Sequence, residues 1–375
     1  MTAWNPEKVR QDFVLLRNTD RVYFDNAATS QKPQCVLDAV EEFYQKYNAN
    51  VLRGLYPLSV EATERYEAAR RTVQRFIHAA CPEEIIFTRN ATESMNLVAY
   101  SYGMANLKAG DEILVSIMEH HSNILPWQMV SRATGAKLVF LECEPDGTIT
   151  KEKMDAAFSE HTRMVAVTQV SNVLGCVNDI PELVKRARAC GAAILMDAAQ
   201  SAPHMPIDVQ KLDVDFVAFS GHKMLAPMGI GVLYGKQELL EKMPPFLTGG
   251  EMIETVSRYD AVYAELPHKF EAGTVNAGGA VGLAAAIDYL ESYGMDKLHA
   301  VEQELTAYLF RGMKAIPHIH VLGSDREDNH TGIVSFAVDQ VHPHDISEVL
   351  SSDGMDIRAG HHCAQPLHDH LGVHS

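Results

Sequence analysis

The chain has 375 residues and is 46% hydrophobic, enough for a large domain with a proper core and a smaller one beside it. Its formal net charge of -17 and pI near 5.5 argue against nucleic acid or an anionic membrane surface as the main partner. Its first residues lack an export signal, and no stretch is apolar enough to span a membrane. We therefore expect a cytoplasmic globular protein with no nucleic-acid or membrane partner.

The six cysteines are scattered and form no CxxC pair. In a chain of this size, such spacing indicates reduced thiols rather than a disulfide framework or a structural zinc site.

The first part of the chain is polar, and we expect residues 1–20 to pack with a smaller C-terminal domain. A short strand follows near Val22, and then a helix over residues 34–47. Ser59 has the character of an N-cap for a long amphipathic helix that ends near residue 78. Residues 85–87 predict a buried strand, after which Thr92 opens a helix whose free N–H groups suit a phosphate.

Strands then alternate with helices as far as residue 235, with helices expected over residues 124–134, 151–160 and 181–189. This alternation predicts right-handed crossovers and an α/β domain with a mainly parallel seven-stranded sheet covered by helices. Ligands of such sheets bind beyond the carboxyl ends of the strands. Polar groups gather at those ends, in the segments 119–121, 171–172, 197–200 and 220–223.

After Gly250 the sequence is loop-rich up to Phe270, and a Gly/Ala-rich helix then introduces a second unit. This unit has expected helices over residues 296–316 and 344–352, with strands near residues 320 and 332–337. It has the pattern of a small α+β domain. We expect a large domain over residues 21–265 and a small one over residues 266–375.

Lys223 follows an almost continuously apolar run, residues 216–219, which is typical of a strand buried on both faces. An ammonium group at the end of such a strand is partly desolvated, so its free amine becomes available as a nucleophile towards a carbonyl. The alternative is a surface lysine whose stem covers the strand end.

Asp197 ends another apolar strand, and a partly desolvated carboxylate there needs a cation. If Lys223 forms a Schiff base with pyridoxal 5'-phosphate (PLP), the protonated ring nitrogen is that cation. The alternative is that Asp197 caps a following helix. In the PLP interpretation, His120 stacks on the ring and Gln200 bonds to its hydroxyl. The phosphate would be held by Thr92, Ser220 and His222.

Six segments carry a family resemblance: EHHSNILPW, QVSNVLG, MDAAQS, FSGHKMLAPMGIG, FEAGTVNAGG and RAGHHCAQPL. They resemble the group II, Suf-type, PLP-dependent cysteine desulfurases, which have fold type I and belong to the class V aminotransferase-like family. The resemblance implies a homodimer that converts L-cysteine to L-alanine, with a persulfide on Cys363, and supplies sulfur for iron–sulfur cluster assembly.

The resemblance also implies roles for individual residues. Lys223 would carry PLP, Asp197 would face the pyridine nitrogen, and His120 would stack on the ring. The remaining cofactor contacts that it implies are Thr92, Asn172, Gln200, Ser220, His222 and, from the other subunit, Thr274.

Cys363 lies in the segment RAGHHC, where a glycine gives freedom and an arginine with two histidines favours the thiolate. Two other interpretations are a buried small hydrophobe and a metal site with His361 and His362. Adjacent residues rarely point at one ion and no fourth ligand is evident, so we expect no metal.

The family pattern continues beyond Ser375 into an arginine that binds the substrate carboxylate, a strand and a final helix, so the resemblance implies a truncated, less stable small domain. On this basis Arg358 and Asn172 are expected to anchor the carboxylate. Two alternatives stay open: a selenocysteine lyase, and a non-catalytic scaffold that holds PLP.

The segment VDQVHPHD resembles the branch of the family that passes sulfur to a small zinc-containing acceptor. The resemblance assigns the contact with the zinc to His342. The alternative is a solvated loop histidine.

Overall fold

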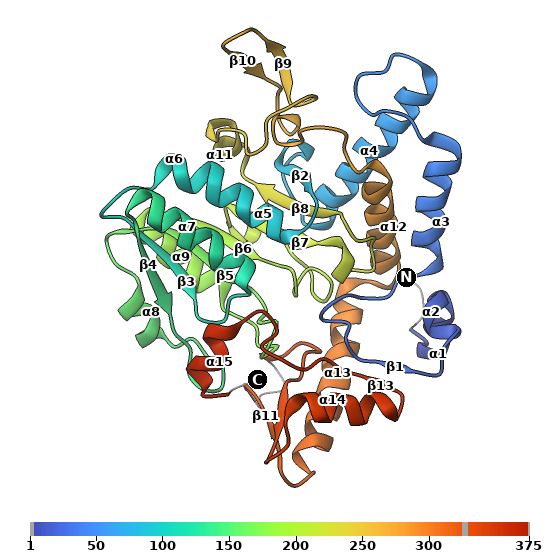
Figure 1. The fold of residues 1–375 in the computed structure, drawn as a ribbon, viewed down its shortest axis with the longest axis vertical. Helices are drawn as coiled ribbons and strands as arrows, with labels where there is room; N and C mark the ends of the chain where they lie inside the picture. Colours follow the sequence, from blue (N-terminus) through green and yellow to red (C-terminus); the bar gives the residue numbers. More distant parts are fainter. Residues whose placement is uncertain (1–3, 325–328, 374–375) are drawn as a thin grey trace.

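A computed structural model describes residues 4–324 and 329–373. A seven-stranded sheet forms its centre (Figure 1), in the order β2 (Ile85–Thr88), β8 (Gly231–Gly235), β7 (Phe216–Ser220), β6 (Ala193–Asp197), β5 (Thr162–Thr168), β3 (Glu112–Ser116) and β4 (Lys137–Leu141). The pairs are parallel except for those of β8, which runs antiparallel to both β2 and β7. The prediction of a mainly parallel seven-stranded sheet is confirmed.

Apolar side chains leave both faces of this sheet in alternation. In β7, Val217 belongs to one core and Ala218 to the other. The first core is covered by α4 (Pro57–Phe76), α9 (Ile180–Cys190) and α12 (Ala277–Tyr293), and the second by α5 (Ala91–Leu97), α7 (Leu125–Thr134) and α11 (Gln237–Lys242). Burial on both faces explains why the central strands are nearly continuous apolar runs.

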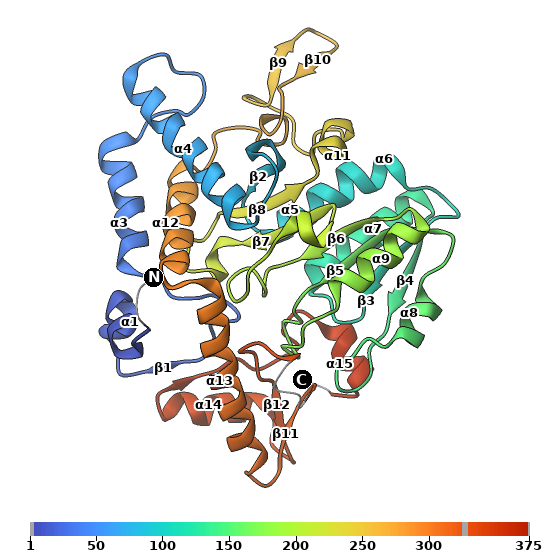
Figure 2. The same ribbon diagram turned by 180° about the vertical axis from the view of Figure 1, so that it is seen from behind.

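A second unit lies below the sheet in Figures 1 and 2. It contains α13 (Met295–Lys314), the antiparallel pair β11 (Ile319–Val321) and β12 (Phe336–Val338), α14 (Pro343–Ser352), β13 (Met355–Asp356) and α15 (Gln365–Leu371). Strand β13 pairs in parallel with β1 (Val22–Tyr23). The unit therefore contacts the start of the chain.

The N-terminal segment also packs against α12. The ring of Trp4, which precedes α1 (Pro6–Asp12), lies edge-on to Tyr293 at 6.1 Å, and Phe13 lies edge-on to Tyr289 at the same distance. Tyr289 donates a hydrogen bond of 2.7 Å to Asp12. The limits of the two domains stay a prediction.

Two local expectations were wrong. Helix α4 begins at Pro57 with Tyr56 as its N-cap, and Ser59 lies buried inside the helix, donating to the Asn50 carbonyl at 2.5 Å. A proline fits the first turn because its missing N–H has no partner there in any helix.

The stretch expected to be loop-rich contains a hairpin of β9 (Ile253–Val256) and β10 (Ala261–Tyr263). This hairpin projects from the body of the molecule in Figure 2. Its tip is exposed, with Tyr259 96% accessible to solvent.

Among the described residues, none of the helices combines the length and the apolar character that crossing a membrane requires. Within the same ranges, no group of three or more His, Cys, Asp or Glu side chains is placed to hold a metal ion.

Candidate active site

The carboxyl ends of the parallel strands bring the predicted residues to one edge of the sheet. Asp197 is the last residue of β6 and Ser220 the last of β7, and these two strands pair side by side. His120 follows β3, and Asn172 follows β5. Such an edge is where open parallel sheets bind ligands.

Lys223 ends the 3₁₀ turn η5 (Gly221–Lys223) that follows β7 directly. Gly221 anchors this turn by donating to the Ile230 carbonyl at 2.9 Å. A Cβ at Gly221 would lie 2.8 Å from the Ile230 side chain, so only glycine fits there. Burial lowers the pKa of Lys223, and the negative charges of Asp197 and Cys363 only partly oppose this. The turn therefore presents an amine that loses its proton more easily than a surface lysine does.

Asp197 is buried, and its carboxylate accepts a hydrogen bond of 2.8 Å from the Ala199 N–H. The chain forms turns after Asp197, so there is no helix directly behind it to cap. Burial raises the pKa of Asp197, while the Ala199 N–H and the Lys223 ammonium oppose the rise. A buried carboxylate with one backbone donor is suited to bind a cationic ring nitrogen.

His120 is fixed in one tautomer by the turn that follows it. Its Nδ1 accepts from the Ser122 N–H at 3.1 Å, so the neutral ring carries its proton on Nε2. Burial, with smaller effects from Lys223 and His121, lowers the pKa of His120 to about 4. The imidazole is therefore neutral near pH 7 and holds an Nε2 proton.

The candidate phosphate contacts come from two elements that touch. Helix α5 starts at Ala91 with Asn90 as its N-cap, so Thr92, expected to open the helix, is its second residue. The Ala91 N–H donates to Ser220 Oγ at 2.8 Å, which ties α5 to the end of β7. A Cβ at Gly231 would lie 2.5 Å from Asn90 Cα, so this close packing requires a glycine.

His222 lies next to Lys223, and its carbonyl accepts from the Ser30 N–H at 3.0 Å and from Lys32 Nζ at 3.1 Å. Burial, followed by the charges of Lys223 and Lys32, lowers the pKa of His222 to about 4. Burial also lowers the pKa of Lys32 to about 8. Sequence reasoning did not identify Lys32.

Gln200 supplies a direct test of whether PLP fits this edge. Its Nε2 donates to the Ala27 carbonyl at 2.9 Å, but its buried Oε1 has no hydrogen-bond partner among the residues that the structure describes. A buried acceptor without a donor is unfavourable. A ring hydroxyl would satisfy it, as a pyridine nitrogen would satisfy Asp197, so these residues fit the cofactor.

Cys363 is exposed, on the loop that leads into α15. Asn172 Nδ2 donates to the His362 carbonyl at 2.8 Å, and the His121 N–H donates to the Cys363 carbonyl at 2.7 Å. The loop is thus attached to the same edge as Lys223. Arg358, expected to anchor a carboxylate, donates to Asp25 at 3.1 Å.

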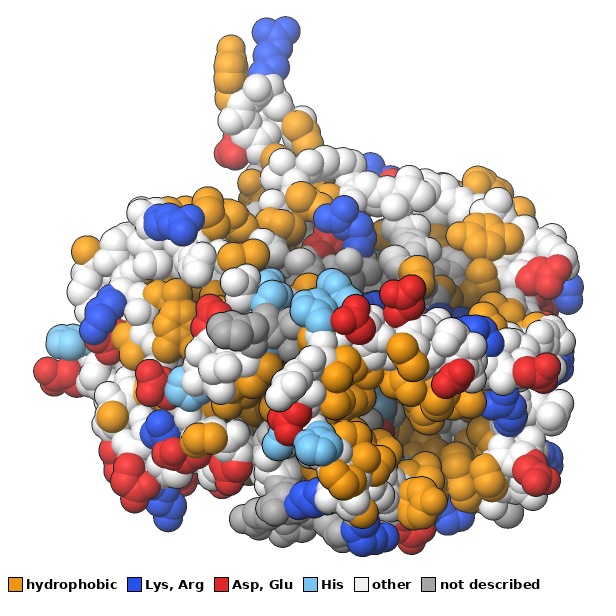
Figure 3. Space-filling model, turned by 60° about the horizontal axis from the view of Figure 1, so that its bottom comes forward, with side chains coloured by type: hydrophobic (Ala, Val, Ile, Leu, Met, Phe, Trp, Pro, Cys, Tyr) orange, Lys and Arg blue, Asp and Glu red, His pale blue; other side chains and the backbone are white. Residues whose placement is uncertain are grey.

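Thr274 and His342 lie outside this group of contacts. Thr274 is exposed just before α12, and His342 is the exposed N-cap of α14. A mostly apolar groove of about 730 Å³ connects His342 with Gly360 and His361 of the cysteine loop. Figure 3 looks onto a face where histidine side chains gather beside apolar ones.

Glu119 is a buried residue of the site that sequence reasoning left without a role. Its carboxylate accepts from Asn123 Nδ2 at 2.7 Å and from the Thr168 N–H at 2.8 Å. Burial raises its pKa to about 8, against the hydrogen bonds from Ser116 and Asn123. The sequence did contain an indication that Glu119 belongs to the site, because it directly precedes His120 and follows an apolar strand.

Comparison with known proteins agrees with this geometry. The sequence profile of the class V aminotransferases matches residues 22–375. The chain belongs to this family. A probable cysteine desulfurase of Halalkalibacterium halodurans is 53% identical over 94% of the chain and 86% of its own length. A probable cysteine desulfurase of Synechocystis is 51% identical over 96% and 87%.

Solved structures of this class V family show the same fold. The apo cysteine desulfurase of Thermococcus onnurineus superimposes with a TM-score of 0.95 and 42% identity, over 100% of the chain and 92% of its own. A cysteine desulfurase of Escherichia coli superimposes with a TM-score of 0.91 and 39% identity, over 99% of the chain and 92% of its own.

Proposed function

We propose that the protein is a PLP-dependent cysteine desulfurase that converts L-cysteine to L-alanine and supplies sulfur for iron–sulfur cluster assembly in the cytoplasm. The observation that carries this proposal is the half-buried Lys223 after β7, with Asp197 at the end of the neighbouring strand β6 and the Cys363 loop bonded to the same edge of the sheet. Relatives about half identical to the chain and named as cysteine desulfurases support it. We place the protein in the Suf-type group on its motifs.

Lys223 would hold PLP, with Asp197 at the ring nitrogen and Gln200 at the ring hydroxyl. When bound, PLP supplies an electron sink for bond breaking in the amino acid. The phosphate would be held by Thr92, Ser220 and His222, with Asn172 beside the ring and Thr274 reaching it from the other subunit of a homodimer.

The protein's own groups then handle protons and sulfur. His120 holds a proton on Nε2 for transfer at the cofactor, and Lys223 accepts one as a free amine. The Cys363 thiolate forms a bond to the substrate sulfur while the carbon–sulfur bond of cysteine breaks. In sum, L-cysteine and the Cys363 thiol give L-alanine and a Cys363 persulfide. Arg358 and Asn172 would orient the substrate carboxylate.

His342 would receive a small zinc-containing sulfur acceptor. It borders the groove that also includes Gly360 and His361, so a partner in that groove would come close to the Cys363 loop. The test is alanine production with and without a purified Suf-type zinc acceptor. His342→Ala should lose the stimulation, and His161→Ala, a change at an exposed histidine before β5, should keep it. Equal stimulation in both variants would refute the assignment.

The test of the main proposal is to incubate the purified protein with PLP, L-cysteine and a reductant, and to measure alanine and sulfide. Lys223→Ala and Cys363→Ala should both lose turnover. Cys35→Ala is the matched control because Cys35 is also an exposed free thiol but lies on α3 (Gln34–Glu42). Alanine formed equally by Cys363→Ala and the wild type would contradict the persulfide route.

A further inference from the structure

The loop that carries Cys363 has an unusual backbone. The Ala364 N–H donates to the His361 carbonyl at 2.9 Å, which closes a four-residue turn. The two central residues, His362 and Cys363, have φ angles of 49° and 56°. Positive φ at both central positions is the geometry of a type I′ turn, which glycine and asparagine favour and which a residue such as Cys rarely adopts. Contacts from elsewhere in the fold must therefore stabilise this turn.

Besides the bond that closes it, three hydrogen bonds with other parts of the described chain hold the turn, and His121 makes two of them. Its backbone N–H donates to the Cys363 carbonyl at 2.7 Å, and its Nε2 accepts from the Gln365 N–H at 3.1 Å. The third is the bond from Asn172 to the His362 carbonyl. His121 thus bonds on both sides of the Cys363 side chain.

The Gln365 N–H can only donate, so His121 Nε2 must accept, and the proton of the neutral ring lies on Nδ1. Of the two bonds that His121 makes, this one can be removed by a side-chain substitution, since the backbone N–H of residue 121 stays in any variant except proline. His121 also directly follows His120, whose ring we place against PLP. Residues 120–121 therefore connect the proposed cofactor site with the turn that carries Cys363.

We propose that His121 is a positioning residue that locks the turn bearing Cys363 in its strained conformation beside Lys223. The role in turnover rests on the proposed desulfurase function, but the lock itself does not. Without the Nε2 acceptor, the turn would open more often, and the thiol would spend less time at the substrate sulfur. Binding of PLP and of L-cysteine would be unaffected.

The test compares His121→Phe, which keeps a ring but has no acceptor, with His121→Gln, whose side-chain oxygen can accept from Gln365. His161→Phe is the control at an exposed histidine remote from the loop. Amide hydrogen exchange of a peptide covering residues 360–367 is measured without substrate, and the thermal unfolding of each variant is recorded. In His121→Phe, exchange should rise about 3- to 10-fold, the size of one lost hydrogen bond.

In the same variant, kcat for alanine formation should fall by a similar factor, with KM for L-cysteine unchanged. His121→Gln and His161→Phe should both behave like the wild type. Unchanged exchange in His121→Phe, or exchange in His121→Gln as fast as in His121→Phe, would overturn the proposal. Because exchange needs no turnover, a wild type that made no alanine would refute the desulfurase function without affecting this result.

Discussion

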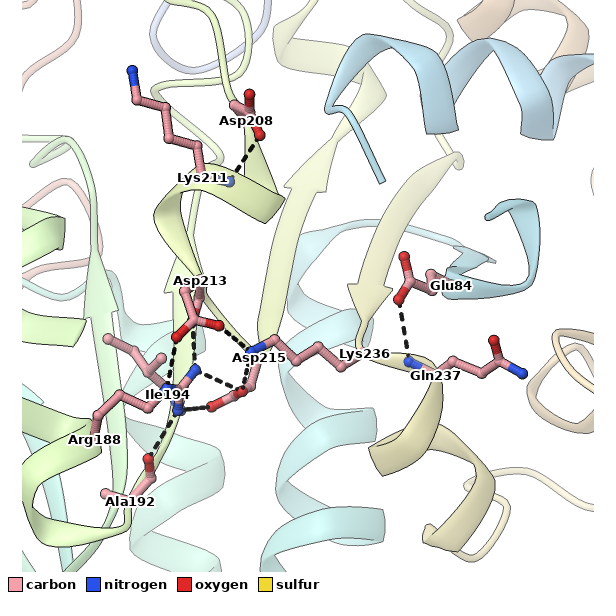
Figure 4. A network of polar contacts seen from close by, with 10 residues as sticks. All are labelled: Glu84, Arg188, Ala192, Ile194, Asp208, Lys211, Asp213, Asp215, Lys236 and Gln237. Atoms are coloured by element: carbon pink, nitrogen blue, oxygen red, sulfur yellow. Dashed lines mark hydrogen bonds and ion pairs between the residues drawn. The ribbon is translucent and has the colours of Figure 1, made fainter. Parts of the chain in front are cut away.

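At one end of the central sheet the surroundings favour charged side chains, and at the other end they favour neutral ones. At the amino ends of β6 and β7, Arg188 donates to both oxygens of Asp215, at 2.7 and 2.8 Å, and to Asp213 at 3.0 Å (Figure 4). Lys236 pairs with the same two carboxylates. Burial acts to lower the pKa of Arg188, but the hydrogen bonds that it donates to Asp215 and Asp213 outweigh this effect, so the pKa rises. The pKa of Asp213 is lowered by its hydrogen bonds with Lys236 and Arg188, against the effect of burial, so these contacts favour the charged forms of Arg188 and Asp213.

At the carboxyl ends, burial shifts each group towards its neutral form. The pKa values of Lys223, His120 and His222 fall, and that of Asp197 rises. Perturbed groups that converge in this way mark functional sites. One edge of the sheet therefore stabilises the fold, whereas burial at the other edge disfavours the charged forms of the reactive groups at a cost in stability.

The largest expected effect on activity comes from a change at the carboxyl ends of the strands, where Lys223 lies. Lys223→Ala should reduce alanine formation on the order of 10⁴-fold or more, the scale of losing a catalytic nucleophile. The free energy of unfolding without PLP should not fall, because the change removes a desolvated amine that forms no ion pair with the residues that the structure describes. Enzyme assays and urea unfolding measure the two effects. A large loss of stability with activity retained would reverse our assignment of this edge.

The converse change disrupts the ion pairs at the amino ends of β6 and β7. Arg188→Met should lower the free energy of unfolding by about 1–3 kcal/mol, because it leaves the nearly buried Asp215 with fewer donors, and kcat should stay the same. Urea unfolding provides the measurement. The matched control is Lys185→Met on the same helix, whose exposed pair with Glu182 is worth less than about 1 kcal/mol. Equal effects of the two variants would show that the Arg188 network adds no special stability.

The stability of the PLP-free protein should also depend on pH. His120 and His222 have folded-state pKa values of about 4, below the ordinary 6.5, so the unfolded chain binds more protons between these values. Their contribution to stability is therefore complete above pH 6.5 and is lost as the pH falls towards 4. Thermal unfolding over this range tests it. His222→Asn should flatten the dependence, and an unchanged slope would count against the assignment.

The smallest predicted effect concerns Ser122, whose hydroxyl lies 2.7 Å from Thr92 Oγ1 and 2.9 Å from His120 Nδ1. Ser122→Ala should weaken PLP binding by about 2- to 10-fold, because two contacts of the cofactor lose a shared partner. Titration by cofactor absorbance gives the dissociation constant. Ser131→Ala, in the last turn of α7, is the control and should bind PLP like the wild type. Weaker binding in the control as well would indicate a general loss of order.

Most helices were predictable because their apolar residues recur with the helical period, and the central strands were predictable because they are nearly continuous apolar runs. The β9–β10 hairpin was not, because its residues are mostly exposed and carry no buried alternation. Lys223 and Asp197 were identifiable from strands that end in a charged group. The bond between His121 and Gln365 was not, since it joins residues 244 positions apart, and only the folded chain brings them together.

The division between the two edges of the sheet is tested by the mass of the Cys363 peptide after the PLP-loaded protein has reacted with L-cysteine without a reductant. We expect one additional sulfur atom on Cys363 in the wild type and in Arg188→Met, and none in Lys223→Ala. Additional sulfur in Lys223→Ala, or none on Cys363 in a wild type that forms alanine, would contradict the division between the two edges of the sheet.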